Sequence, residues 1–328
     1  MEGQSGFFAR PHEQDGTQFI ILGYNDPKSP ENNLEAWFLP SRGCNLCRFS
    51  YGGERIIDAD LARLAETGFP GNPVLYPTPN RVRRSRFVYK GCTFEQEKRG
   101  KKIALHGLVL DEQWQHDAPV VRDDGVSLRT WIDFEPESAM FAAFPIRHRL
   151  TMDYTLTASG VSMTYTVDNR DAQELPFGLG FHPFFSKLSG DDGTLVRVPA
   201  TRVMDYTSDL LPTGRMIDVD GTIYDLRQEF HVGKKELGHV FTDLIPGEAA
   251  TVRYSKQGIL MRLIATEDFT HIVYYSPRGS DIFCIENQTC STDAHNLNDQ
   301  GFTREAHLLV VQPGEKLSGT VTFAVEHI

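Results

Sequence analysis

The stretch LTMDYTLTASGVSMTYTV, residues 150–167, decides the fold class of this chain. Its large apolar residues alternate with polar ones on both sides of an Ala-Ser-Gly turn at 158–160. Successive side chains of a strand point to opposite faces, so alternation of period two is typical of a strand with one buried face. Two such runs joined by a glycine turn predict an antiparallel hairpin.

The same alternation recurs at residues 127–134 (SLRTWIDF) and after the Pro-Gly-Glu turn at 313–315. Helix signals are few: we predict one short helix at 59–67, capped by Asp58 and ended by Gly68, and a further turn of helix at 233–239. Many strands with closely spaced turns predict an all-β fold, either a large antiparallel sandwich or a barrel. No repeat or linker divides the chain, so we expect one domain over residues 1–328, with 68–79 as an ordered loop.

Composition excludes several classes of protein. The chain has 328 residues, of which 40% are hydrophobic, which is enough for a substantial core. Its net charge of -11 disfavours nucleic-acid binding, because a phosphate backbone repels an acidic protein. No apolar run approaches the ~18 residues of a membrane span, and the polar N-terminus lacks the features of a secretory signal. Five cysteines predict no disulfide framework, so we expect a cytoplasmic protein.

Four arginines lie within six positions, at residues 81–86. Guanidinium groups bind phosphate well, but in a strand Arg81 and Arg83 face one way while Arg84 and Arg86 face the other. The segment therefore predicts no single basic patch, and a solvated edge strand with one buried, paired arginine is the simpler interpretation. The lysine-rich run at 98–102 is interpreted as an exposed hairpin tip.

Three titratable residues lie in apolar surroundings. His106 precedes a glycine within ALHGL, where a buried structural histidine is the commoner outcome. His182 lies in GLGFHPFF, residues 178–185, where either general acid–base catalysis or aromatic packing would account for it. Glu286 follows an apolar run; burial raises the pKa of an unpaired carboxyl toward the range of a working base, whereas a buried ion pair is the alternative.

Cys44 and Cys47 form a lone Cys-x-x-Cys pair, whereas structural zinc takes four ligands. Cys284 and Cys290 have the wrong spacing for a second pair, so we predict no metal site. The chain also lacks the glycine-rich nucleotide motifs, the serine-hydrolase motif and the HExxH motif of metalloproteases.

A series of short motifs follows in order along the chain. They are Pro79-Asn80-Arg81-Val82, His106-Gly107, His182-Pro183-Phe184-Phe185, Leu211-Pro212-Thr213-Gly214, Gly221-Thr222, Asp225-Leu226-Arg227, Glu286-x-Gln288, Asp293-Ala294-His295-Asn296 and Pro313-Gly314-Glu315. In this order and spacing they resemble the aldose 1-epimerase (galactose mutarotase-like) family, over roughly residues 44–325.

The resemblance implies a large galactose mutarotase-like β-sandwich with a few short helices and a sugar-binding cleft across one sheet. It also implies interconversion of the α and β anomers of a small-molecule sugar, without a metal or another cofactor. By motif position, His182 resembles the general acid and Glu286 the general base, and we expect them to face each other across a space that fits a pyranose. Arg81 and His106, with Asn80 beside Arg81, resemble substrate-binding residues.

The implied chemistry needs these residue types. A base takes the proton of the anomeric hydroxyl while an acid protonates the ring oxygen; the ring opens, and rotation about C1–C2 precedes reclosure. Arg81 and His106 would donate hydrogen bonds to sugar oxygens and polarise the ring oxygen. Phe184 and Trp131 are candidates for stacking on the sugar.

Three departures from the family pattern concern the substrate. Gly238 stands where many members carry an aspartate that binds sugar hydroxyls, and Asp243 is not an assured replacement. Ser85 stands at the usual glycine before the aromatic of the Asn-Arg segment. The element at Glu286 has one extra residue before Asp293. The identity of the sugar therefore stays open.

Two alternative functions also stay open. A sugar-phosphate (hexose 6-phosphate) 1-epimerase would hold the phosphate with Arg83, Arg84 or Arg86. A non-catalytic sugar-binding protein would use the same fold for recognition alone. The sequence does not indicate the oligomeric state.

Overall fold

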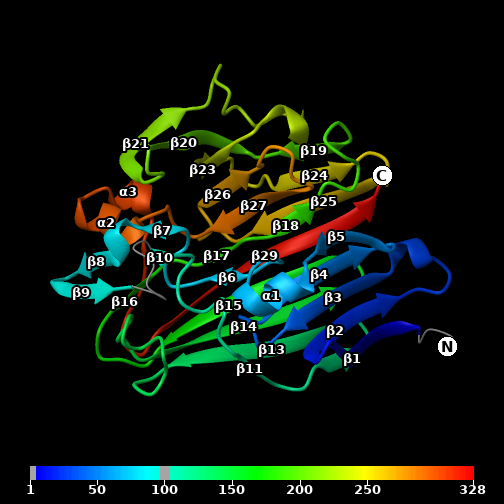
Figure 1. The fold of residues 1–328 in the computed structure, drawn as a ribbon, viewed down its shortest axis with the longest axis horizontal. Helices are drawn as coiled ribbons and strands as arrows, with labels where there is room; N and C mark the ends of the chain where they lie inside the picture. Colours follow the sequence, from blue (N-terminus) through cyan, green and yellow to red (C-terminus); the bar gives the residue numbers. More distant parts are fainter. Residues whose placement is uncertain (1–4, 97–103) are drawn as a thin grey trace.

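The computed structural model describes residues 5–96 and 104–328. Two large sheets, of 13 and ten strands, contain most of the strands in this part of the chain, and three two-stranded sheets flank them (Figure 1). The all-β fold, a large antiparallel sandwich with a few short helices, is confirmed. The predicted hairpin tip at 98–102 lies within 97–103, outside the described residues.

The 13-stranded sheet carries most of the strands that matter below. Its main path is β1 (Gly6–Gln14), β2 (Thr17–Asn25), β3 (Leu34–Leu39), β4 (Asn45–Tyr51), β5 (Glu54–Asp58), β18 (Phe184–Ser186), β27 (Ile282–Gln288), β26 (His271–Tyr275), β23 (Gly238–Leu244), β20 (Ala200–Tyr206) and β21 (Pro212–Asp218), with β17 (Gly180–Phe181) on β27 and β6 (Val74–Leu75) on β17.

The ten-stranded sheet covers the inner face of the first. Its path is β11 (Gln115–His116), β13 (Gly125–Phe134), β14 (His148–Thr157), β15 (Gly160–Asn169), β29 (Lys316–His327), β25 (Ile259–Ala265), β24 (Ala250–Tyr254), β19 (Thr194–Arg197) and β22 (Phe230–His231), with β12 (Val120–Arg122) on β13. The small sheets are β7 (Arg81–Val82) with β10 (Ala104–Leu105), β8 (Arg86–Tyr89) with β9 (Cys92–Glu95), and β16 (Leu175–Phe177) with β28 (Leu309–Val311).

The helices are short. They are α1 (Leu61–Thr67), α2 (Ala294–Asp299) and α3 (Thr303–Ala306), with 3-10 turns η1 (Pro30–Asn32), η2 (Arg83–Ser85) and η3 (Val232–Lys234). Helices α2 and α3 lie at one end of the molecule beside β7 and β8 (Figure 1). Among the described residues, no helix is long and apolar enough to cross a membrane.

The predicted hairpin at 150–167 is confirmed as β14 and β15. Buried and half-buried residues alternate without a break along β14, as its sequence pattern predicts. The buried side chains lie between the two sheets, where Tyr154 contacts Phe38 with ring centroids 4.5 Å apart. Phe323 of β29 likewise lies between Phe49 and Phe185 of the opposite sheet. Apolar burial between the sheets is therefore what holds this architecture together.

The short helix predicted at 59–67 is present as α1, but Asp58 is not its cap. Asp60 is, because its carboxylate accepts from the amides of Ala62 and Arg63 at 3.0 and 3.1 Å. The Asp58 carboxylate instead forms ion pairs with Arg48 and Arg55. Gly68 ends the helix as predicted, in the left-handed conformation at φ 71.

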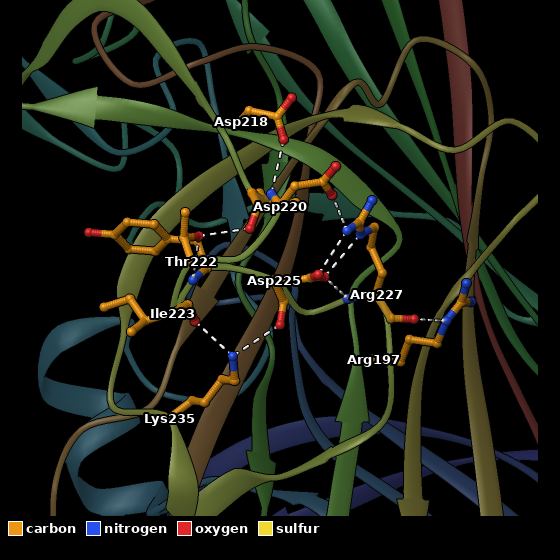
Figure 2. A network of polar contacts seen from close by, with 10 residues as sticks. Arg197, Asp218, Asp220, Thr222, Ile223, Asp225, Arg227 and Lys235 are labelled. Carbon is orange, nitrogen blue, oxygen red and sulfur yellow. Dashed lines mark hydrogen bonds and ion pairs between the residues drawn. The ribbon is translucent and has the colours of Figure 1, made fainter.

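The Asp225-Leu226-Arg227 motif has a structural role in the loop before β23. Figure 2 shows Arg227 between Asp225 and Asp220, with the Arg227 Nε donating to Asp225 Oδ1 at 2.9 Å. Lys235 donates to the carbonyls of Ile223 and Asp225 at 2.7 and 3.0 Å. These bonds fix the chain where it enters β23. The turn predicted at 233–239 is the 3-10 turn η3 instead of a longer helix, and β23 begins within the predicted range.

Candidate active site

An open cavity of about 330 Å³ lies where β23, β26 and β27 meet the β17–β18 corner and the segments around β7 and β10. All five predicted site residues line it, so residues up to 206 positions apart in the sequence converge on one space. The lining consists of Arg63, Phe69, Asn80, Arg81, Leu105, His106, His182, Phe184, Leu210, Gly238, Val273, Tyr275 and Glu286.

His182 and Glu286 are in direct contact. His182 lies between β17 and β18, Glu286 lies on β27, and both short strands pair with β27. The pairing leaves His182 Nε2 3.2 Å from Glu286 Oε1. The expectation that a pyranose-sized space separates them is therefore wrong. The ring oxygen and the anomeric hydroxyl of a sugar are both bonded to C1, so two side chains in direct contact can still reach both oxygens.

Two glycines explain how β17 comes so close to β27. A Cβ at Gly180 would lie 2.8 Å from the Gln288 side chain, and one at Gly178 would lie 2.2 Å from Cys290 Sγ. Any larger residue would push the His182 segment away from Glu286. The glycines that precede His182 in the sequence thus have a packing role next to the site.

Glu286 is almost completely buried, with 2% of its surface exposed. Its Oε2 accepts a hydrogen bond from Gln288 Nε2 at 2.9 Å, which leaves Oε1 toward His182. Burial raises the pKa of Glu286 to about 8, while Gln288 and Arg81 act in the opposite direction. The alternative of a buried ion pair with an arginine is not what the structure contains, because no arginine lies within ion-pair distance of Glu286 among the described residues.

His182 is enclosed by aromatic rings. Its imidazole stacks on Phe184 at 4.6 Å between centroids, and the edges of Phe69 and His106 approach it at 5.0 Å. Burial lowers the pKa of His182 well below the ordinary value, and His106 adds to this. The aromatic packing that the sequence left open for His182 is therefore present, and its role in proton transfer stays a prediction.

Arg81 and Asn80 enter the cavity from the start of β7. Asn80 has a left-handed backbone, at φ 61, and its Oδ1 accepts from Arg81 Nη1 at 3.2 Å. The Arg81 carbonyl accepts from the amide of Asp293 at 3.0 Å, which joins this segment to the N-terminus of α2. The Asn80 carbonyl accepts from the amide of His106 at 2.8 Å. These backbone hydrogen bonds fix the positions of Asn80, Arg81 and His106 relative to one another.

His106 follows β10 and is a neutral imidazole. Burial and the neighbouring Arg81 lower its pKa to about 3. Its Nδ1 is buried without a hydrogen-bond partner among the described residues. Phe69 stacks against it at 5.5 Å. The residue has a left-handed backbone, at φ 65, and so does Gly107 after it, at φ 75.

We expect Gly107→Ala to destabilise the protein and to disturb His106. A Cβ there would lie 2.1 Å from the Tyr76 carbonyl oxygen, in a backbone conformation that L-residues avoid. The left-handed conformation costs about 1–2 kcal/mol, and forcing the clash apart costs about 1–3 kcal/mol more. Urea unfolding followed by fluorescence measures the sum.

Gly16→Ala is the matched control, because Gly16 has the same φ of 75 and no atom near its missing Cβ. Its free energy of unfolding should fall only by the cost of placing alanine in a left-handed backbone conformation, about 1–2 kcal/mol. Equal losses in the two variants would mean that the Tyr76 contact has no energetic role.

Several lining residues had no signal in the sequence. Arg63 projects from α1, Phe69 follows it, and Leu105, Leu210 and Tyr275 form an exposed apolar rim. Their chemistry is ordinary and only the fold brings them together. The ordered loop predicted at 68–79 was the nearest hint, since it carries Phe69 to the aromatic cluster around His182.

The arginine segment 81–86 is not one strand, so the prediction of alternating faces is wrong beyond Val82. Arg84 and Ser85 have left-handed backbones, at φ 55 and 52, which break the strand into β7, η2 and β8. Ser85 thus adopts a conformation that suits the family's usual glycine. Arg83 is paired, with Nε 3.2 Å from Asp293 Oδ2, but its side chain is 38% exposed, so the prediction of a buried arginine is wrong.

Two further candidates do not reach the cavity. Asp243 pairs with Arg202 and Arg304 outside the lining of the cavity, so it does not stand in for the missing carboxylate at Gly238. Trp131 lies on β13 of the ten-stranded sheet under Arg149. Of the two stacking candidates, only Phe184 lines the cavity.

Metal-binding capacity coincides with the acid–base pair. Among the described residues, the group able to offer three ligands is His182, Cys284 and Glu286, whose ligand atoms lie within 4.8 Å of one another. Cys44 and Cys47 are buried free thiols outside this group. Burial raises the pKa of both thiols to about 12, which disfavours the thiolate that zinc needs.

The fold and the cavity together define a class of protein, a β-sandwich with a buried imidazole–carboxylate pair inside an open pocket. The chain belongs to the aldose 1-epimerase family. The family model described as "Aldose 1-epimerase" matches residues 31–324, which confirms the resemblance seen in the motifs.

Proteins similar to this chain carry names from the same family. The "Uncharacterized protein YphB" of Escherichia coli is 24% identical over 267 residues, 77% of this chain and 82% of that protein. A solved galactose mutarotase-like protein of Clostridium acetobutylicum has a TM-score of 0.87 at 18% identity, and covers 98% of this chain and 99% of its own. Galactose 1-epimerase of Lactobacillus acidophilus has a TM-score of 0.78 at 15% identity, over 99% of each chain. At these identities the solved structures establish a shared fold.

Proposed function

We propose that this protein is an aldose 1-epimerase, which interconverts the α and β anomers of a sugar by opening and reclosing its ring. The single observation that carries the proposal is the 3.2 Å contact between His182 Nε2 and Glu286 Oε1 inside an open cavity. Arg81, His106 and Asn80 supply hydrogen-bonding groups around the same space. Membership of the aldose 1-epimerase family supports the assignment.

The pair can supply both protonation states that the reaction needs. Because burial raises the pKa of Glu286 to about 8 and lowers that of His182, the two groups together hold one proton at neutral pH and carry no net charge. Transfer of this proton from Oε1 to Nε2 gives a carboxylate base beside an imidazolium acid. The overall charge stays zero, and the two charges that form lie 3.2 Å apart, so their attraction offsets part of the cost of creating them in a buried site.

Ring opening then proceeds with balanced protons. Glu286 takes the proton from the anomeric hydroxyl, His182 gives its proton to the ring oxygen, and the C1–O bond to that oxygen breaks as the aldehyde forms. After rotation about C1–C2, His182 takes the proton back from the C5 hydroxyl as its oxygen attacks the other face of C1. Glu286 returns its proton to the new anomeric hydroxyl. Arg81 and neutral His106 donate hydrogen bonds to sugar oxygens as charge develops.

The direct test is anomer exchange in purified protein. Magnetisation transfer by NMR between α and β signals, or polarimetry on freshly dissolved single anomers, should show exchange above the uncatalysed rate for at least one aldose in a panel. A panel without any acceleration would refute the enzyme assignment. Binding without exchange would instead favour the non-catalytic sugar-binding alternative.

The shared proton also predicts a pH profile. Above pH about 8 Glu286 loses the proton of the pair, so His182 has none to donate and kcat/KM should fall. On the acid side the pair gains a second proton only below the lowered pKa of His182, so activity should persist well below pH 6.5, the ordinary histidine value. Exchange rates measured from pH 4 to 10, each corrected for the buffer-catalysed rate, give the profile.

Gln288→Met provides a check on the cause of the alkaline limb. Gln288 donates to Glu286 Oε2, which favours the ionised carboxylate and lowers its pKa. Removing that donor should move the alkaline limb to higher pH. A limb at the same pH in both proteins would assign it to a different group.

Three coarser expectations accompany this proposal. We propose that the chain acts as one sandwich domain, that it works in the cytoplasm, and that its small-molecule partner is a sugar and not a nucleic acid. The five free cysteines and the net charge of -11 support the last two points.

A further inference from the structure

Two arginines at the candidate site, Arg63 and Arg81, have no ion-pair partner in the part of the chain that the structure describes. Most other arginines of the described chain pair with a carboxylate, as Arg48 does with Asp58. Arg81 donates only to Asn80 Oδ1, and the Arg63 guanidinium has no carboxylate within ion-pair distance among the described residues. An unpaired guanidinium at a cavity is available to an anion.

Arg63 is held in place by a well-fixed helix. The Asp60 carboxylate accepts from the Arg63 amide at 3.1 Å, and the next residue, Leu64, is fully buried. Gly68 closes the helix with a bond to the Leu64 carbonyl at 2.8 Å, and Phe69 then enters the cavity. The exposed Arg63 side chain therefore lines the mouth of the cavity from a short but capped element.

The described lining of the cavity contains little negative charge that could neutralise these arginines. Among the residues that the structure describes, Glu286 is the sole carboxylate in the lining of the cavity, and its raised pKa leaves it protonated at neutral pH within the pair. Gly238 contributes no side chain, and Asp243 is occupied by Arg202 and Arg304. A protein of net charge -11 thus presents a locally cationic cavity.

We propose that the substrate is an aldose with an anionic group, a phosphate or a carboxylate, on a carbon remote from C1, and that Arg63 binds this group at the mouth of the cavity. This inference rests on the proposed 1-epimerase function. The sugar-phosphate alternative from the sequence placed the phosphate on Arg83, Arg84 or Arg86. The structure favours Arg63 instead, because Arg83 is paired with Asp293 and neither Arg84 nor Arg86 lines the cavity.

Two observations place the anionic group on a carbon far from C1: how deeply the reacting pair is buried, and which proton Glu286 has to remove. The reacting pair is buried, with 8% and 3% of the His182 and Glu286 side chains exposed, whereas Arg63 is exposed at the mouth. An anion that reaches Arg63 while C1 meets the pair has to sit on a distant carbon. A sugar 1-phosphate is excluded as a substrate, because its anomeric oxygen carries no proton for Glu286 to remove.

The test compares a neutral hexose with its 6-phosphate and with its uronic acid, in the gluco and galacto series, by NMR anomer exchange. We expect kcat/KM for one anionic sugar to exceed that for the parent hexose by about ten- to a hundredfold. The phosphate and carboxylate arms identify the source of the charge. In Arg63→Met this preference should fall toward one, and Arg63→Lys should keep part of it.

Arg84→Met is the matched control, because Arg84 is also exposed but does not line the cavity, and its preference should equal that of the wild type. Equal kcat/KM for neutral and anionic sugars, or an unchanged preference in Arg63→Met, would overturn the anion inference while leaving the epimerase proposal intact. Absence of exchange with every sugar would overturn the epimerase proposal. In that case, calorimetric titration with hexose 6-phosphate and hexuronate tests the anion site. The anion inference requires Arg63→Met to bind these sugars more weakly than Arg84→Met does, and equal binding would overturn it.

Discussion

Replacing Glu286 with glutamine is expected to lower kcat for anomer exchange by about 10²–10⁴-fold in a chain that stays folded. Glutamine has nearly the same shape and can still accept the hydrogen bond from Gln288 that Glu286 accepts at 2.9 Å. It cannot take the proton of the anomeric hydroxyl. The loss should therefore fall on the chemical step, with sugar binding retained.

The same variant should gain stability at alkaline pH. The pKa of Glu286 is about 8 in the folded chain and near 4.5 in the unfolded chain, so the unfolded state releases the proton more readily. The favourable contribution of the protonated carboxyl is complete below pH 4.5 and is lost as the pH rises through 8. Glu286→Gln removes this loss, on the order of a few kcal/mol at most. Thermal unfolding at pH 5 and pH 9 compares the two proteins.

Glu137→Gln serves as the control, because Glu137 is exposed and lies outside the cavity. It should change neither the exchange rate nor the pH dependence of stability. Should Glu286→Gln retain exchange within tenfold of the wild type, the carboxylate would not be the base and the mechanism would have to be abandoned.

Local sequence patterns predicted the parts of the fold that are decided locally. Strands β14 and β15 follow from alternation, because each residue's face is fixed by its position in the strand. The break at Arg84 and Ser85 could not be predicted, since two successive left-handed residues contradict their ordinary preferences. The cap of α1 was placed two residues early, because which aspartate is free depends on the arginines that occupy Asp58.

In the candidate site too, the sequence predicted which residues take part but not the contacts that depend on packing. Motif resemblance predicted His182 and Glu286, and the structure brings their side chains together. Their direct contact was not predicted, because it depends on β17 approaching β27 through Gly178 and Gly180. Arg63 carries no motif at all. Only the packing of α1 places it at the cavity, which is why the sequence pointed to the arginines at 83–86 instead.

Replacing His182 with asparagine is the second large effect we expect, again a fall in kcat of about 10²–10⁴-fold. The variant loses the group that we propose protonates the ring oxygen, and Glu286 loses the partner 3.2 Å away with which it would share a proton. His106→Asn makes the same substitution in the same cavity. Asparagine tolerates the left-handed backbone at His106, so that variant should fold and lose mainly substrate affinity. Kinetic constants from NMR exchange separate kcat from KM in both.

The double variant His182→Asn with Glu286→Gln tests whether the two groups act as one unit. If they share one proton and transfer protons in one event, removing the second group costs little once the first is gone, so the double variant should be no slower than the slower single variant. Independent actions would multiply instead, and the double variant would lose the product of the two factors. The wild-type contact at 3.2 Å favours the first outcome, because neither group can reach its working protonation state without the other. A multiplicative loss would therefore separate the acid from the base and remove the physical basis of the shared-proton mechanism.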